Sequence, residues 1–237
     1  MTNGWVDIKN TDMMLIMGGN PAENHPCGFK WAIEAKRNRN AKMIVVDPRY
    51  TRTASVSDLF LQIRAGSDIA FLGGMLRYAM ENNRIAKDYV LNYTNAAFIV
   101  KDGFKLPEGD GLFSGFDAKT QTYDKATWNY AGTGGGGGKD SAQGYTMGAA
   151  AHPPSSNAPK PPSLPEKVEF DLSLQNPNCV YQLMRKHYSR YTPEVVERIT
   201  GIPKEQFLKA ADLFTSVRKD GDTKKVSTII YAVGWTH

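Results

Sequence analysis

Cysteine is scarce in this chain. Only two, Cys27 and Cys179, occur in 237 residues. They are far apart and match no spacing typical of metal ligands, and two cysteines cannot build a disulfide framework. The sequence therefore excludes a cysteine-rich metal site and a disulfide-stapled scaffold. We expect both residues to be small, buried, apolar side chains.

Long apolar runs are also missing. No run approaches the roughly 20 residues that span a bilayer. The N-terminal stretch MTNGWVDIKNTD lacks the basic-then-apolar layout of a signal peptide. We therefore expect a soluble chain with no direct membrane insertion, and the sequence leaves its localisation unknown.

A concentrated block of one charge sign is absent as well. Lysine and arginine number 29 against 24 aspartates and glutamates, for a formal net charge of +5, but the basic residues are spread along the chain. This pattern indicates a solvated surface and argues against nucleic acid as a partner. A mildly basic surface can still gather an anionic ligand.

The chain lacks both common glycine-rich fingerprints for phosphates. There is no G-x-G-x-x-G, so an ordinary nicotinamide-dinucleotide site is not indicated. The segment GGGGGKD has no serine or threonine after its lysine and no apolar strand before it. Five consecutive glycines, followed by AHPPSSNAPKPPSLP, are costly to order. Residues 103–167 are therefore predicted to be a Gly/Pro-rich surface insertion, partly disordered.

What is present in the first hundred residues is an alternation of strand and helix patterns. MMLIMGG, KMIVVDPRY and LFLQIRAG predict short apolar strands. GFKWAIEAKRNRN places Phe29, Ala32 and Ile33 at helical spacing on one face. Ser67 should cap a helix with Asp68 in its first turn. The alternation predicts an α/β fold with a largely parallel sheet flanked by helices.

Beyond the insertion, regular structure should return. CVYQLMRKHYSRY has the periodicity of an amphipathic helix. Thr192 should cap another helix, which Gly201 closes, and Pro203 should open the next one. Val226–Ala232 is predicted to be a final, buried strand that breaks at Gly234.

The same patterns predict the domain organisation. Residues 1–102 and 168–237 should be two parts of one α/β domain, and residues 103–167 should interrupt it. Because a natural domain rarely stops just past a buried strand, we expect the chain to be a fragment of a larger protein.

Three predicted strands end on residues that could hold a ligand, and ligands of open parallel sheets bind outside the carboxyl ends of the strands. The glycines of GGNPAENHP allow close approach to a phosphate. After the second strand, Asp47 is placed to accept hydrogen bonds from a ribose, and Arg49 could pair with a phosphate or a carboxylate. After the third, the Asp68 carboxylate could accept the paired N–H donors of a guanine edge.

Each ending also has an ordinary explanation. Gly-Gly after a strand is commonly a turn, Asp-Pro is a common strand terminator, and Gly-Ser-Asp before a helix is commonly a cap. Taken singly, each ending favours that structural explanation.

Taken together and in this order, the segments resemble one family. LIMGGNPAENHP, AKMIVVDPRYTRTA and SVSDLFLQIRAGSDIAFLGG, followed by YTPEVVERITGIPKEQFLKAADLF and YAVGWTH, are similar to the large subunit of molybdenum- or tungsten-dependent formate dehydrogenases. These belong to the bis-molybdopterin-guanine-dinucleotide oxidoreductases. The resemblance covers roughly residues 4–102 and 168–237 and is nearest to the membrane-associated, respiratory type. It implies a Rossmann-like, three-layer domain.

The resemblance also implies which residues bind the cofactor. One guanine dinucleotide arm of the cofactor would contact four groups of residues. The phosphates and dithiolene-side groups would lie at Gly18, Gly19, Asn20, Glu23 and Asn24, and the nucleotide shelf would be formed by Val46, Asp47, Pro48 and Arg49. The guanosine would be held by Ile63, Gly66 and Asp68, and the pterin would lie close to Val233, Gly234 and His237. His25 matches a family histidine, which could cap the following turn or contact the ligand.

Several motifs of that family are missing here. The chain has neither the four-cysteine iron–sulfur segment nor the metal-ligating cysteine or selenocysteine with its catalytic histidine. The resemblance therefore implies no catalytic or metal-ligating residue in this chain, which should be inactive alone and should bind no cofactor by itself. The implied partners are the remainder of the catalytic subunit and an iron–sulfur electron-transfer subunit. The alternative is a non-redox α/β module for guanine nucleotides or for assembly.

Overall fold

The computed structural model describes residues 3–107, 109, 111–132, 168–222 and 224–236. These residues form two compact units, one from Met1–Ala86 and Tyr188–His237 and the other from Lys87–His187. The first unit is discontinuous, because Lys87–His187 separates its two segments along the chain. The GGGGGKD segment lies outside the described residues.

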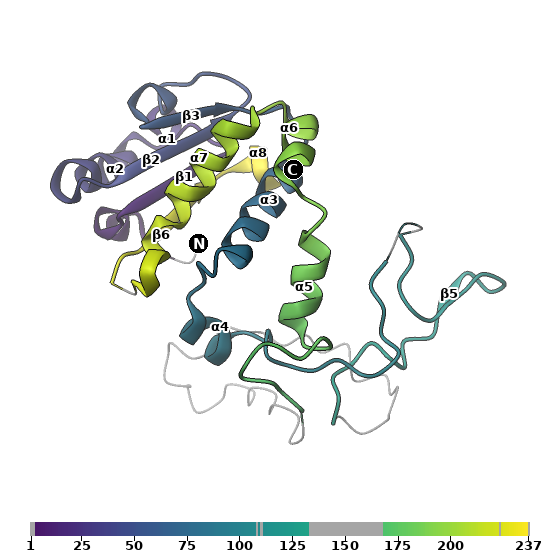
Figure 1. Cartoon of the computed structure of the whole chain (residues 1–237). Coiled ribbons are helices and arrows are strands. Elements are labelled where there is room, and N and C mark those ends of the chain that lie inside the picture. The colour runs from purple at the N-terminus through teal and green to yellow at the C-terminus, as the bar shows by residue number, and fades with distance from the viewer. Residues whose placement is uncertain (1–2, 108, 110, 133–167, 223, 237) are drawn as a thin grey trace, which may run out of the picture. The chain divides into compact units, whose positions relative to one another are not determined.

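A four-stranded parallel sheet forms the centre of the first unit. Its strands are β1 (Met13–Met17), β2 (Lys42–Asp47), β3 (Leu59–Gln62) and β6 (Ser227–Tyr231). They lie in the order β3-β2-β1-β6, and every neighbouring pair is parallel (Figure 1). The predicted parallel α/β sheet is therefore confirmed.

The central strand β1 is buried along its whole length. Its residues alternate between the two faces of the sheet, so Leu15 belongs to one core cluster and Ile16 to the other. The register aligns Leu15 with Ile44 of β2 and with Ile229 of β6. Burial on both faces explains why the strand is an unbroken apolar run without alternation.

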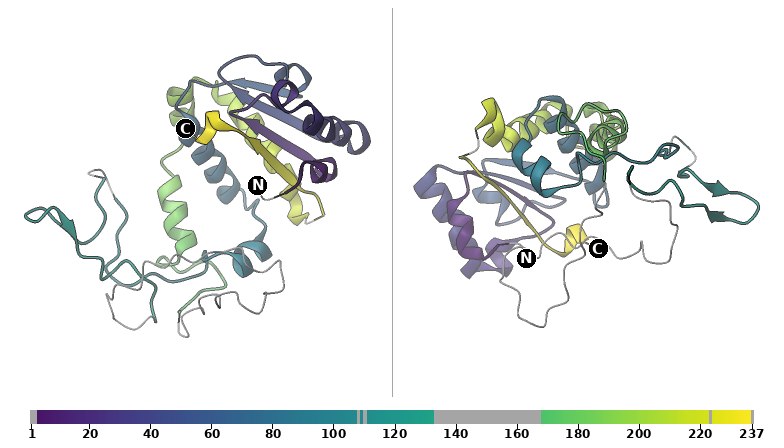
Figure 2. Two further views of the ribbon diagram at one scale, coloured as in Figure 1. Left: turned by 180° about the vertical axis from the view of Figure 1, so that it is seen from behind. Right: turned by 90° about the horizontal axis from the view of Figure 1, so that it is seen from below.

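Helices cover both faces of the sheet and make three layers (Figure 2). One face packs against α3 (Asp68–Glu81), α6 (Pro193–Thr200) and α7 (Lys204–Thr215). The other packs against the 3-10 helix η1 (Trp5–Asn10) and α2 (Pro26–Arg39). Short helical turns complete the unit: α1 (Pro21–Asn24), η2 (Ala54–Val56), η4 (Ser216–Gly221) and α8 (Val233–Thr236).

Two predictions about buried residues of the first unit are wrong. The final strand was expected to be buried, yet β6 alternates between exposed and half-buried residues, and Ile229 and Tyr231 remain exposed. The reason is that β6 pairs with β1 alone among the described strands. Ile33 is also exposed, although Phe29 and Ala32 on the same helix are buried as predicted.

The helix-end predictions have mixed outcomes. The Thr192 hydroxyl accepts a hydrogen bond from the Val195 N–H, and Gly201 ends α6 with φ 77°, both as expected. Pro203 occupies the N-cap position of α7. Ser67 stands at the N-cap of α3, but its hydroxyl does not cap the helix. It donates instead to the Arg64 carbonyl at 2.6 Å, which leaves the first turn of α3 without a side-chain cap.

The two cysteines differ in exposure. Cys179 is fully buried, as expected, but Cys27 is exposed in the first turn of α2.

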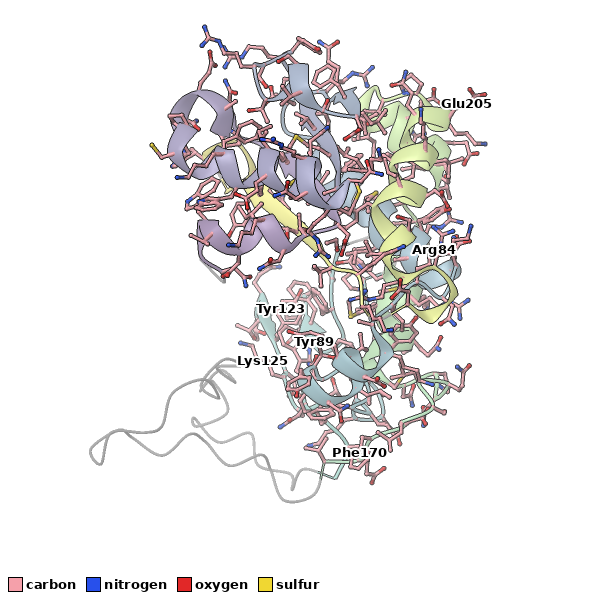
Figure 3. The ribbon with its side chains drawn as sticks, turned by 90° about the vertical axis from the view of Figure 1, so that its left-hand side faces the viewer. Arg84, Tyr89, Tyr123, Lys125, Phe170 and Glu205 are labelled. Atoms are coloured by element: carbon pink, nitrogen blue, oxygen red, sulfur yellow. The ribbon has the colours of Figure 1, made fainter. Side chains whose placement is uncertain are left out.

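An arginine ties the end of α3 to α7. Arg84 lies beside α7 (Figure 3), where its guanidinium forms an ion pair with the Asp212 carboxylate at 2.8 Å. The same guanidinium donates to the Thr215 hydroxyl at 3.0 Å. This cluster lies at the end of α7 that leads towards the start of β6, away from the carboxyl ends of the strands.

The second unit has little regular structure among its described residues. It contains α4 (Lys87–Tyr93), α5 (Val180–Tyr188), which ends at the boundary, and a hairpin of β4 (Phe116–Asp117) and β5 (Thr122–Tyr123). Tyr123 packs against Trp128 with ring centroids 5.1 Å apart, and the Lys125 ammonium lies 5.5 Å from the same ring (Figure 3). Aromatic contacts thus hold a hairpin that is too short to be stable alone.

Across the described residues, none of the helices has the length and apolarity needed to cross a membrane.

Candidate functional site

A pocket lies where β1, β2 and β3 end. Its volume is about 450 Å³, and it collects residues from all three predicted strand endings and from the turn after β6. Carboxyl ends of parallel strands meet at one edge of the sheet, which is why segments so far apart in sequence converge here. The lining residues are Gly18, Gly19, Asn20, Asn24, Val46, Asp47, Pro48, Arg49, Ile63, Ala65, Gly66, Asp68 and Gly234.

Most of the predicted site residues therefore lie together, with three exceptions. Glu23 and Val233 are not part of the lining, and His237 lies outside the described residues. The sequence interpretation missed Ala65, which lies between the end of β3 and Gly66. The only signal for it was its position, because an alanine side chain carries no distinctive chemistry.

The glycines after β1 form a closely packed floor. Gly18 has φ +67°, and a Cβ on it would lie 2.6 Å from the Trp235 backbone nitrogen. A Cβ on Gly19 would lie 2.8 Å from the Ala232 Cβ, and the Gly234 N–H donates to the Gly18 carbonyl at 3.2 Å. These glycines therefore let the ends of β1 and β6 touch, which is a structural requirement beyond any approach to a phosphate.

The ending of β2 presents a cation at the pocket. The Asp47 carboxylate accepts a hydrogen bond from the Arg49 backbone N–H at 2.8 Å, which fixes the turn around Pro48. The Gln62 side chain donates to the Pro48 carbonyl at 3.0 Å and holds the same turn from β3. The Arg49 guanidinium has no hydrogen bond or ion pair to the described residues, so it is available to an anion.

The ending of β3 presents a carboxylate. Gly66 has φ +79° and no atom within 4 Å of the place a Cβ would occupy, so the backbone here borders open space. Asp68 follows in the first turn of α3 and is half-buried. Its carboxylate has no partner among the described residues. The pocket thus combines an unpaired cation, an unpaired anion and backbone groups, which together suit a zwitterionic or nucleotide-like ligand.

Glu23 and His25 are engaged elsewhere. The Glu23 carboxylate pairs with Arg52 at 3.1 Å and accepts a hydrogen bond from the Asn20 side chain. The His25 ring is within hydrogen-bond distance of the Asn24 side-chain oxygen, at 2.9 Å, and stacks on Trp5 at 5.4 Å. It makes no side-chain cap of α2, and it does not line the pocket.

No group of three or more histidine, cysteine, aspartate or glutamate side chains in the described part of the chain could hold a metal ion. The described residues that line the pocket include no nucleophile paired with a base.

A comparison with protein families decides the assignment. The family model described as molybdopterin oxidoreductase matches residues 1–235. The chain belongs to the molybdopterin oxidoreductase family.

Members of this family with similar sequences include two subunits of formate dehydrogenases. The chain is 46% identical over 236 residues to the nitrate-inducible formate dehydrogenase major subunit of Escherichia coli (strain K12). It is 44% identical over 236 residues to the formate dehydrogenase major subunit of Haemophilus influenzae. Each alignment covers 100% of this chain and 20% of the relative, so the chain spans about a fifth of the length of the relatives it matches.

One solved structure has a weaker likeness to this chain. Acetylene hydratase from Pelobacter acetylenicus aligns with 98% of this chain and 21% of its own chain, at 16% identity and a TM-score of 0.47. This likeness is too low to bear on function.

Proposed function

We propose that this chain is the part of a formate dehydrogenase catalytic subunit that binds one guanine dinucleotide arm of a molybdopterin cofactor. The observation that carries the proposal is the pocket at the strand ends, where the unpaired Arg49 guanidinium and the unpaired Asp68 carboxylate lie in one lining. Membership of the molybdopterin oxidoreductase family supplies the chemical class of the ligand.

The residues present fit such a group. A guanine dinucleotide carries phosphates, ribose hydroxyls and a guanine edge with adjacent N–H donors. The Arg49 guanidinium is suited to a phosphate, the Asp47 carboxylate to a ribose and the Asp68 carboxylate to the guanine N–H groups. Gly66 leaves open space beside them. When bound, the cofactor's metal would accept the two electrons of formate oxidation.

The activity of the whole enzyme is part of the same proposal. The relatives are called major subunits, which supports the proposal that the parent protein works with further subunits. We infer that the parent protein oxidises formate to carbon dioxide and passes electrons to iron–sulfur centres in the rest of the catalytic subunit and in an electron-transfer subunit. Molybdenum and tungsten both remain compatible with this chain's residues, since none of those described forms a metal site.

Calorimetric titration with nucleotides tests the binding proposal. Guanosine diphosphate should bind the 237-residue chain more tightly than adenosine diphosphate, because adenine lacks the paired N–H donors that a carboxylate accepts. Asp68→Asn should lower the affinity for guanosine diphosphate by about tenfold, since a charge-assisted pair of hydrogen bonds is lost. The same substitution should leave the affinity for adenosine diphosphate almost unchanged.

Asp88→Asn is the matched control, because Asp88 also lies in the first turn of a helix, α4, but not in the pocket lining. Equal affinity for the two nucleotides, or an equal effect of the two substitutions, would contradict the proposal.

A further inference from the structure

A buried hydroxyl lies behind the pocket and contacts one of its lining residues. Thr53 has 0% of its surface exposed, and Asn20, which lines the pocket, has 8%. The Thr53 hydroxyl donates to the Asn20 side-chain oxygen at 2.7 Å and accepts from the Ala22 N–H at 3.1 Å. Thr53 itself does not line the pocket, and it comes from the segment after β2.

These contacts determine which way the Asn20 amide is turned. The Thr53 backbone N–H also donates to the Asn20 side-chain oxygen, at 3.3 Å. The other end of the amide donates to Glu23, whose carboxylate is held in turn by Arg52. Turning the amide over would set its NH2 group against the Thr53 backbone N–H and its oxygen against the Glu23 carboxylate, and the buried Thr53 N–H would lose its acceptor.

The orientation leaves a donor for a ligand. An amide NH2 group has two N–H bonds, and Glu23 accepts one of them. The second has no partner among the described residues, and Asn20 belongs to the pocket lining.

We propose that Thr53 is a positioning residue, which holds the Asn20 amide so that its free N–H donates to a phosphate oxygen of the bound nucleotide. This inference rests on the proposed function, because it needs a phosphate-bearing ligand in this pocket. Thr53 does not line the pocket, so its effect on a ligand would pass through Asn20. The alternative is that Thr53 only supports the fold, in which case its loss would lower stability without a selective effect on binding.

A double-mutant cycle with guanosine diphosphate as the probe separates the positioning role of Thr53 from a purely structural role. Thr53→Val keeps the shape but removes the hydroxyl, and it should weaken binding by about tenfold. Thr53→Ser keeps the hydroxyl and should restore nearly wild-type affinity. Asn20→Ala should weaken binding by a similar factor, and adding Thr53→Val to Asn20→Ala should have little further effect.

Thr215→Val is the matched control. Thr215 is likewise buried, donates to the Ala211 carbonyl at 2.7 Å and accepts from Arg84, but it lies at the far end of α7. It should lower the melting temperature without changing the affinity. The proposal is overturned if Thr53→Val binds as the wild type does, or if its effect simply adds to that of Asn20→Ala.

The wild-type titration separates this inference from the proposed function. If the wild-type chain binds no guanosine diphosphate, the proposed function and this inference fail together. If the wild type binds and the cycle is additive, the positioning role alone fails.

Discussion

Replacing Gly18 with alanine tests whether close packing, and not only backbone conformation, requires glycine after β1. Gly18 and Gly66 share a left-handed backbone, with φ +67° and +79°. They differ in space, because a Cβ at Gly18 would lie 2.6 Å from the Trp235 nitrogen and 2.9 Å from the Gly234 carbonyl carbon, whereas at Gly66 nothing lies within 4 Å. Comparing the two glycines therefore separates the cost of a left-handed backbone from the cost of steric contact at a Cβ.

The expected magnitudes follow from these contacts. The left-handed conformation costs a residue with a Cβ roughly 1–2 kcal/mol, and Gly66→Ala should lower the free energy of unfolding by this amount alone. Gly18→Ala should lower it by about 1–3 kcal/mol more, from overpacking, because the obstructing atoms are backbone and cannot rotate away. The difference between the two variants should therefore be about 1–3 kcal/mol in the free energy of unfolding.

The measurement must report on the first unit alone, since a chain of two units need not unfold in one step. Hydrogen exchange of the β1 and β2 amides in increasing urea meets this need. Each 1.4 kcal/mol should appear as about a tenfold faster exchange through global opening. Equal losses for the two variants would refute the argument, because the contact between the ends of β1 and β6 would then contribute nothing.

Two further predictions concern charge and activity. The pKa of Asp58 is raised by burial, but hydrogen bonds from Lys36 and the Met43 N–H, with the charges of Lys36 and Lys42, outweigh burial and hold it below its ordinary 3.8. A depressed pKa stabilises the fold above the ordinary value, and the benefit is lost as the pH falls through the folded-state pKa. Asp58→Asn should thus lower the urea midpoint at pH 7, and the difference should shrink as the pH falls below 3.8 and through the folded-state pKa. A difference that stays constant with pH would contradict this. The 237-residue chain alone should not reduce a viologen dye with formate, because neither cysteine matches the metal-ligating motif that the resemblance leads us to expect. A measurable rate from the pure chain would show that prediction to be wrong.

The local sequence predicted the sheet well because burial on both faces leaves an unmistakable trace. MMLIM and MIVV are unbroken apolar runs, and both proved to be buried strands. The same reasoning wrongly predicted burial for β6. Its sequence STIIY contains apolar residues, but the strand lies at the edge of the described sheet. Sequence reports how well a residue tolerates burial, whereas its exposure depends on which neighbours a strand has.

The pocket could be predicted in outline and not in its supporting contacts. Parallel topology alone was enough to bring Asp47 and Asp68 to one edge. The link between Thr53 and Asn20 was not foreseeable, because a threonine 33 residues away carries no sign of its partner. Ser67 shows the same limit, since this typical cap residue accepts no hydrogen bond from the first turn of α3 and instead donates to the Arg64 carbonyl.

The pairing of β1 with β6 has a consequence for the order of assembly. The Val226 N–H donates to the Asp12 carboxylate across a separation of 214 residues, so this edge of the sheet can close only after the entire second unit has been synthesised. At about 5–20 residues per second, that interval is on the order of ten seconds or more. Gly234, on the floor of the pocket, is the last of its lining residues to be synthesised. The pocket therefore cannot be complete before the second unit and β6 have both been synthesised.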